Sequence, residues 1–417
     1  MSLSIQSHTG LSIKKKTLAD TLFFLVILLI ISPWFFERRL LFNEILSAAG
    51  FLILAYKKFR ISNDAVSRYV VLLLGWGLVH MVVSLARMDS LYYYLRNVVI
   101  IYSVFAYFAG YFLFRYVEPF LNRFGSILHA YILFFLLVPV STYLFERFGM
   151  ATLFPAMFNK TRINRVVFPL LIVMDIIYSF TYSSATLLII TAFYLLLWIS
   201  PGYRFFKQVI LIFLVAFTAF FIHVQPNLSL IAERFSPYND FGIIDVRNSH
   251  PLLFIDPNST WRLIMWKEVI VDHFPANIFG LGFGTPVMIY FPVEDYSKVD
   301  ILPYVLGAHN SFIYLFGRLG IVYVILTVLL YRGIIKEYFS FQSYHTANKT
   351  ILFFWSFFAI SIIAVFNPVL ESPIFAGVYW LVLGLLSRAI LKRKREYGAV
   401  PDVRREPSTV PNDSLHN

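Results

Sequence analysis

Long apolar runs recur along this chain, and each is long enough to cross a lipid bilayer as a helix. A membrane-spanning helix needs about 20 predominantly apolar residues. The expected spans cover residues 19–36, 40–56, 67–86, 97–114, 125–145, 166–182, 184–200, 208–224, 310–331, 350–367 and 373–391. The run at 19–36 resembles a signal peptide, but no small-residue cleavage site follows it, so we expect it to stay as an anchor. The pattern predicts an all-α, polytopic membrane bundle of about 11–12 transmembrane helices.

The composition agrees with a protein solvated mainly by lipid. Hydrophobic residues make up 59% of the chain, charged residues only 14%, and the mean hydropathy is +0.71. The chain has no cysteine. Disulfides, thiolate metal sites and cysteine nucleophiles are therefore excluded.

The positive charge is concentrated at the ends of the apolar runs. The net charge is +12, with basic clusters at residues 14–16, 57–60 and 392–395. Such clusters anchor membrane helices on the cytoplasmic side, so they predict contact with membrane lipids and no nucleic-acid partner. Residues 1–18 are expected to be a cytoplasmic N-terminus, and residues 392–417 a disordered cytoplasmic tail.

One long hydrophilic stretch, residues 225–308, separates about eight expected spans in 19–224 from about three in 309–391. It holds five basic and nine acidic residues, a net charge of −4, whereas the rest of the chain carries +16. The low Lys and Arg count predicts an external loop. Eight spans counted from a cytoplasmic N-terminus would instead leave the loop inside. Either the 147–165 stretch or the apolar run that begins at Val166 is therefore miscounted.

Within this loop, Arg262 has the setting of a phosphate ligand. Asn258–Thr260 are natural N-caps, so a short helix is expected to begin there and to end before Pro275. Arg262 would then lie in the first turn, where free backbone N–H groups and a guanidinium group together bind phosphate without a metal. The alternative is a surface arginine paired with Asp256 or Glu268.

Two further features lie near the C-terminal end of the loop. Gly280, Gly282 and Gly284 are more consistent with a turn that lets backbone approach closely than with a nucleotide site, because no strand or helix flanks them as that motif requires. His309 begins the next span, with Asn310 or Ser311 as the helix cap. A neutral imidazole there could accept a proton from a sugar hydroxyl, or His309 could simply cap the helix.

Several catalytic patterns are missing from the sequence. The loop has no Asp-x-Asp pair, and the chain has no His-x-x-x-His or His-Glu-x-x-His spacing. A metal-assisted reaction and a metal cofactor are therefore not expected. A nucleophile elbow and a phosphate-binding loop of the Walker type are also lacking, which argues against acyl transfer and ATP hydrolysis.

The order of these features resembles the O-antigen ligase and O-antigen polymerase superfamily of bacterial inner-membrane glycan transferases. The resemblance covers residues 166–335 in detail and the rest by hydropathy. Its parts are a tight turn at 181–186, Glu233-Arg234-Phe235, Trp261-Arg262 with Trp266, the glycine run, and His309-Asn310 followed after nine residues by Gly320-x-x-Tyr323.

The resemblance implies a C-type glycosyltransferase fold with one large periplasmic loop that contains short helices. It implies transfer of a glycan from undecaprenyl diphosphate to an acceptor hydroxyl, inverting and without metal, at the periplasmic face of the inner membrane. His309 would be the catalytic base, and Arg262 and Arg234 would neutralise the leaving diphosphate. Trp266 and Asn310 would contact the substrates.

The chain departs from the family at Ser183-Ser184, where members usually carry an arginine that helps to hold the diphosphate. Its task would fall to Arg162 or Arg165, to Arg96 or to Arg318, each of which has the alternative role of a snorkelling helix-end residue. This departure bears on which member of the superfamily the chain resembles more than on the superfamily itself.

Three functions remain open at this point. A ligase passes the chain to lipid A core, and a polymerase passes it to a second lipid-linked glycan; the His-Asn pattern favours a ligase. A transporter of lipid-linked oligosaccharide belongs to a different class. It is disfavoured because only Asp175 lies deep in a span and no internal repeat is found.

Overall fold

A computed structural model describes residues 42–57, 64–123, 162–181, 185–199, 203–234, 262–263, 265–287, 308–340 and 349–398. Regular structure in these residues is helical throughout, with no strand among them. The expected spans at 19–36 and 125–145, the N-terminus at 1–18 and the turn at Ser183-Ser184 lie outside the described residues.

The helices follow the expected spans closely. The N-terminal elements are α3 (Phe42–Tyr56), α4 (Ala65–Leu85), α5 (Leu91–Tyr102), the 3-10 turn η1 (Ser103–Phe105) and α6 (Ala106–Arg123). The central elements are α10 (Arg162–Thr181), α11 (Ala185–Ile199) and α12 (Tyr203–Arg234). The C-terminal elements are η4, a π-helical turn (Glu268–Asp272), α14 (Ala276–Phe279), α15 (Ser311–Ser340), α16 (Lys349–Phe366) and α17 (Pro373–Gly398).

Five described segments are long and apolar enough to cross a bilayer. They are Ala65–Leu85, Leu91–Glu118, Arg204–His223, Ser311–Ser340 and Phe375–Glu396. Two shorter apolar helices are Asn43–Tyr56 and Phe353–Phe366. These helices are compatible with a multi-pass membrane protein.

Two of the expected boundaries fall inside helices. The hydrophilic loop was expected to begin at residue 225, but α12 continues to Arg234, because the residues from Leu228 to Arg234 are mostly good helix formers. The polar tail was expected to begin at Lys392, but α17 continues to Gly398. Here the basic side chains pair with other helices: Lys392 with Glu118 at 2.6 Å and Lys394 with Glu337 at 3.3 Å.

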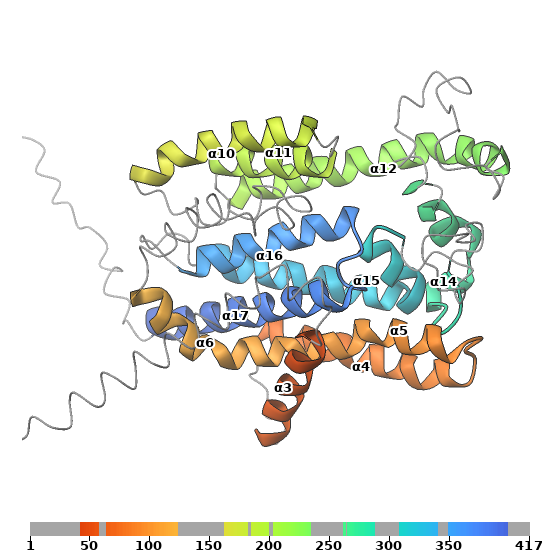
Figure 1. Ribbon diagram of the computed structural model, residues 1–417, viewed down its shortest axis with the longest axis horizontal. Coiled ribbons are helices and arrows are strands. Elements are labelled where there is room, and N and C mark those ends of the chain that lie inside the picture. The colour runs from red at the N-terminus through yellow and green to blue at the C-terminus, as the bar shows by residue number, and fades with distance from the viewer. Residues whose placement is uncertain are drawn as a thin grey trace, which may run out of the picture.

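The long helices form a layered bundle. Figure 1 shows α10, α11 and α12 along one long side, α4, α5 and α6 along the opposite side, and α15, α16 and α17 between them. The helix α17 contacts α6, α3 and α16, and α15 contacts α4 and α14. The C-terminal helices are therefore the centre on which both sides assemble.

Close helix contacts depend on glycine. A Cβ on Gly110 would lie 2.1 Å from the carbonyl oxygen of Leu381, and one on Gly384 would lie 2.1 Å from that of Tyr107. Because each glycine lets the backbone of the other helix approach, α6 and α17 meet closely. Small residues serve the same purpose at helix interfaces in membranes, where dispersion contacts hold helices together.

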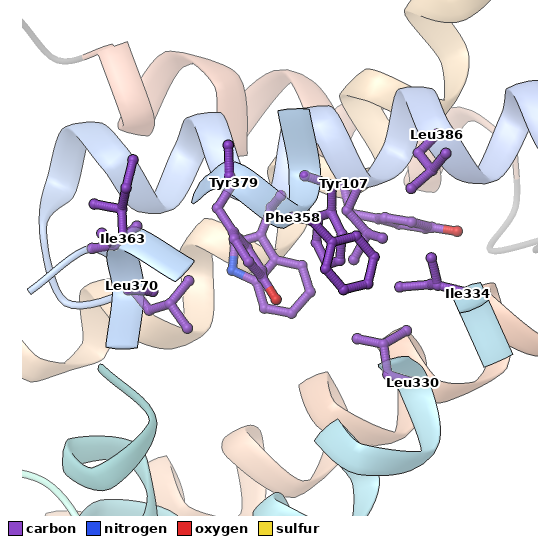
Figure 2. Packing of buried hydrophobic residues seen from close by; sticks show 14 of the residues in the cluster. Tyr107, Leu330, Ile334, Phe358, Ile363, Leu370, Tyr379 and Leu386 are labelled. Carbon is purple, nitrogen blue, oxygen red and sulfur yellow. The ribbon is translucent and has the colours of Figure 1, made fainter. Parts of the chain in front are cut away.

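Aromatic side chains fill the middle of the bundle. Figure 2 shows Tyr107, Phe358 and Tyr379 converging between the helices, with Leu330 and Ile334 beside them. These residues are buried, and the hydroxyl groups of Tyr107 and Tyr379 form hydrogen bonds within the core. The hydrophobic core thus lies between the helices along the middle of the bundle, whereas the candidate site lies at helix ends.

Candidate functional site

The candidate site lies where the chain enters α15. The backbone of His309 has a φ of +49°, an uncommon conformation for a residue other than glycine. The side chain of Asn310 accepts hydrogen bonds from the N–H groups of Phe312 and Ile313, both at 3.0 Å, so Asn310 is the helix cap. Of the two expected caps, Asn310 therefore has this role, and its side-chain oxygen is occupied by the helix.

Ser311, the first residue of α15, is held by the turn between α16 and α17. Its hydroxyl accepts hydrogen bonds from the N–H groups of Val369 and Leu370 at 2.9 and 3.0 Å, and donates to the carboxyl group of Glu371. The other carboxyl oxygen of Glu371 is buried without a hydrogen-bond partner among the described residues. Burial raises the pKa of Glu371 to about 7.

Glu371 was not among the site residues expected from the sequence. The signal was present, because Glu371 is the only acidic residue between positions 350 and 391. An acidic residue in such an apolar stretch is costly to bury and usually has a role.

Trp266 connects the short loop helix, which includes residues 265–272, to the segment that contains His309. Its indole N–H donates to the carbonyl oxygen of Ala308 at 2.6 Å, and its ring lies 5.7 Å from that of Phe217 on α12. Trp266 is buried. It therefore connects α12, the loop helix and the residue before His309.

Arg262 and His309, which are far apart in the sequence, lie close enough to interact electrostatically. Residues 262–263 and 265–272 are helical and the chain turns at 273–275, so the helix expected to end before Pro275 is confirmed for the described residues. Burial, and next the positive charge of Arg262, lower the pKa of His309 to about 4. The imidazole is therefore neutral at pH 7. The expected partner Asp256 lies outside the described residues.

The end of the loop helix is fixed by side chains from the same segment. Asn277 donates to the carbonyl oxygens of Val269 and Ile270 at 2.8 and 2.9 Å, and Lys267 pairs with Asp272 at 2.7 Å. The two Asn277 contacts satisfy carbonyl groups that the end of a helix leaves without partners. The segment that carries Arg262 is thus internally braced.

The glycine run is a turn that allows close approach of backbone, as expected. Gly280, Gly282 and Gly284 have φ values of +87°, +78° and +86°. The N–H groups of Leu281 and Gly282 donate to carbonyl oxygens of α15, and those of Phe283 and Gly284 to the side chains of Ser84 and Asn97. A phosphate cradle needs free N–H groups, so this turn does not offer one.

Gly320 breaks α15 and provides the partners for that turn. Its φ of +73° interrupts the helix, so the carbonyl groups of the preceding turn are released from helical bonding. Gly317 and Arg318 accept hydrogen bonds from Leu281 and Gly282 at 2.8 and 2.9 Å, and Leu319 accepts one from the indole of Trp76 at 2.7 Å. The nine residues between Asn310 and Gly320 are therefore a separate short helix.

Arg318 is buried and serves the same turn. One guanidinium nitrogen donates to the carbonyl oxygens of Gly282 and Thr285, and another donates to the hydroxyl of Tyr314 at 3.0 Å. Its side chain thus holds the glycine turn against α15. The guanidinium group of Arg318, one of the candidates for a diphosphate contact, therefore binds backbone carbonyl groups.

The other expected substrate ligands lie on three separate helices. Arg96 is exposed on α5, with a contact of 3.4 Å to the hydroxyl of Tyr92, and Arg165 is exposed on α10. Arg234 is the last residue of α12, and Arg162 the first of α10. The side chains of Arg162 and Arg234 lie outside the described residues.

No metal centre is formed by the described part of the chain, in which no three His, Cys, Asp or Glu residues gather.

Comparisons with protein-family models, with curated proteins and with solved structures find no match for this chain.

Proposed function

We propose that this chain is a glycosyltransferase that moves a glycan from a lipid diphosphate to an acceptor hydroxyl, in the manner of an O-antigen ligase. The observation that supports it best is that a cationic Arg262 lies near enough to a buried, neutral His309 to influence it electrostatically. The proposed donor is undecaprenyl-diphosphate-linked glycan, and the proposed acceptor is lipid A core. The site would face the periplasm from the bacterial inner membrane.

The chemistry needs a group that removes a proton and a positive charge near the leaving group. The acceptor oxygen attacks the anomeric carbon, the bond from that carbon to the diphosphate oxygen breaks, and the diphosphate leaves with the electron pair. The hydroxyl proton passes to a nitrogen of His309, while Arg262 opposes the charge that develops on the diphosphate. Attack from the side opposite the leaving group inverts the anomeric configuration.

The low pKa of His309 fits a base that becomes effective when the donor binds. In the protein without donor, the His309 imidazole has a pKa of about 4 and is a weak base at pH 7. A bound diphosphate would offset the charge of Arg262 and raise the pKa of His309 towards its usual range. Proton transfer would then be favourable only with the donor in place, which limits unproductive reactions.

The test is transfer by purified protein in detergent with EDTA, given the lipid-diphosphate-linked glycan and lipid A core. We expect His309→Ala to lower the rate at least 100-fold, the usual contribution of a general base. Arg262→Lys should lower the rate at least tenfold, because an ammonium group cannot form the bidentate contact. Arg332→Lys, at an exposed site on α15, is the matched control and should transfer at the wild-type rate.

The outcomes separate the candidate functions. Product formed only with a second lipid-linked glycan as acceptor would make the protein a polymerase. Binding of the donor without product from either acceptor would argue for a transporter. Asp175, the buried carboxyl that a transporter could use, accepts a hydrogen bond from Thr191 between α10 and α11. Equal rates for wild type and His309→Ala would remove His309 from the mechanism.

A further inference from the structure

A second group of charged side chains lies at the end of the bundle opposite the candidate site. The site end is marked by Ser90, whose N–H bonds to the glycine turn at 3.2 Å, and by the start of α17 near Ser311. Following α5 and α6 away from Ser90 leads to Arg115, and following α17 away from Ser311 leads to Arg388. Lys57, directly after α3, lies at the same end, because it reaches the ring of Phe112 on α6.

Two of these cations lie against one aromatic ring. The Lys57 ammonium is 5.0 Å from the centre of the Phe112 ring, and the Arg115 guanidinium is 4.3 Å from it. The two charges are therefore no more than about 9 Å apart. Like charges at such a distance repel one another, and an anion bound between them would replace that repulsion by attraction.

Arg388 adds a third positive charge from the neighbouring helix. Its guanidinium lies 5.2 Å from the centre of the Tyr111 ring and approaches the hydroxyl of Tyr111 at 3.3 Å. Tyr111 and Phe112 are consecutive on α6, and α6 contacts both α3 and α17. Three helices thus bring one cation each to the same end of α6.

The nearby carboxyl groups do not neutralise these cations. Glu118, one turn beyond Arg115, pairs with Lys392 at 2.6 Å, and Glu396 pairs with the same lysine at 3.6 Å. Among the described residues, no ion pair forms with Lys57, Arg115 or Arg388. Within the described part of the chain, these three cations therefore have no ion-pair partner.

An apolar surface leads away from these charges along α3. Ile45, Ala48, Leu52 and Tyr56 are exposed and follow the helical repeat on one face. The ring of Tyr56, 82% exposed, lies 5.4 Å from the Lys57 ammonium. Aromatic rings next to cations at the end of an apolar face are typical of the interface between acyl chains and headgroups.

We propose that Lys57, Arg115 and Arg388 form a binding site for the phosphate of an anionic phospholipid, whose acyl chains lie along the exposed face of α3. Lysine and arginine bind phosphate, and basic pockets between membrane helices bind anionic headgroups. A soluble phosphate ester shares this chemistry, but only a lipid also covers the apolar face. The site is separate from Arg262 and His309 and does not depend on the proposed function.

The test is the amount of lipid that the purified full chain retains from mixed micelles, measured by native mass spectrometry with phosphatidylglycerol or phosphatidylcholine. We expect phosphatidylglycerol to be retained preferentially, and the triple variant Lys57→Gln/Arg115→Gln/Arg388→Gln to retain it at least tenfold less. The control, Arg68→Gln/Arg332→Gln/Lys336→Gln, removes the same charge from exposed positions and should behave as wild type. The double variant Lys57→Gln/Arg115→Gln, at two exposed side chains, should also lose retention and guards against misfolding of the triple variant.

Three results would overturn this site. Retention of phosphatidylglycerol could be equal in the triple variant and wild type. It could fall equally in the triple variant and the control, which would mean diffuse attraction to charge. Inorganic phosphate at millimolar concentration could displace the lipid completely, which would mean a site for a soluble phosphate.

Discussion

The residue with the most unusual combination of properties is His309. Its backbone has a φ of +49°, and its imidazole is held neutral by burial and by Arg262. A residue other than glycine in this conformation costs about 1–3 kcal/mol and persists only where its surroundings fix it. Here the surroundings are the Asn310 cap, the Ser311 contacts and the Trp266 hydrogen bond to Ala308.

The first prediction concerns the charge of His309. In the free protein its pKa, followed by NMR of labelled histidine, should be near 4, and a lipid diphosphate should raise it. The Arg262→Gln variant should have a higher pKa without ligand, because it lacks the nearby positive charge. An unchanged pKa in Arg262→Gln would contradict the electrostatic contact. Arg332→Gln, on another part of the surface, should leave the pKa as it is.

Glu371 gives a second prediction, on stability. Its pKa is raised from 4.5 to about 7 in the folded protein, so the folded state holds a proton that the unfolded state releases between these values. Its contribution, on the order of 3 kcal/mol, is complete below pH 4.5 and is lost as pH rises through 7. Protonation of His309 acts in the opposite direction, with stability lost as pH falls from 6.5 towards 4.

The measurement for Glu371 is the melting temperature in detergent between pH 5.5 and 8.5. Wild type should lose stability between pH 5.5 and about 7 and change little above that, and Glu371→Gln, which cannot ionise, should lose less over the same interval. Glu337→Gln, at the other end of α15, is the control and should keep the wild-type slope. Parallel curves for wild type and Glu371→Gln would show that Glu371 is already ionised in the folded protein.

At the scale of elements, α15 owes its form to the break at Gly320. A Cβ at this position would lie 2.4 Å from the carbonyl oxygen of Ile278 and 2.8 Å from the backbone nitrogen of Gly280, and φ is +73°. The break divides α15 into a short helix that carries the site and a segment of residues 321–340, about 30 Å long. That length matches the hydrocarbon thickness of a bilayer.

We therefore expect Gly320→Ala to destabilise the protein by about 2–4 kcal/mol, because it combines an overlap with backbone and an unfavourable φ. The loss should appear as a lower melting temperature and faster hydrogen exchange at residues 276–284. Gly333→Ala is the matched control in the same helix. Its Cβ would lie at ordinary contact distance, 3.7 Å from the ring of Tyr69. Equal melting temperatures for both variants would contradict the proposed role of the break.

At the scale of the whole molecule, the question is which side of the membrane each end of the bundle faces. The basic end carries Lys57, Arg115, Arg388 and Lys392, and the site end carries the short helices of the loop. The positive-inside rule predicts that the basic end is cytoplasmic and the site end external. The count of spans from the N-terminus gave the opposite side, and residues 124–161, where the count is uncertain, lie outside the described part.

The absence of cysteine makes this prediction simple to test. Single cysteines at Ala276, exposed at the site end, and at Lys394, exposed at the basic end, can be labelled with a maleimide that does not cross membranes. In intact spheroplasts we expect Ala276→Cys to react and Lys394→Cys to react only after permeabilisation. The reverse pattern would place the candidate site in the cytoplasm and exclude a periplasmic transferase.

Much of the secondary structure could be predicted from the sequence. Apolar runs of about 20 residues become helices because lipid leaves backbone groups no other partners, and nine of the expected spans coincide with described helices. The turn at the glycine run and the Asn310 cap were also predictable. Both depend on local chemistry, namely the freedom of glycine at positive φ and the short side chain of asparagine.

The roles of individual polar residues depended on contacts between distant segments. Arg318 was one of four arginines proposed for the diphosphate contact, and its guanidinium bonds to carbonyl groups of Gly282 and Thr285. The partner of Glu371 is Ser311, 60 residues earlier, and only the fold brings the two together. Hydropathy and helix caps act over a few residues, so the positions of the helices could be predicted from the amino-acid order. Burial and pairing are properties of the folded chain, so the meeting of charged groups depended on how distant segments pack.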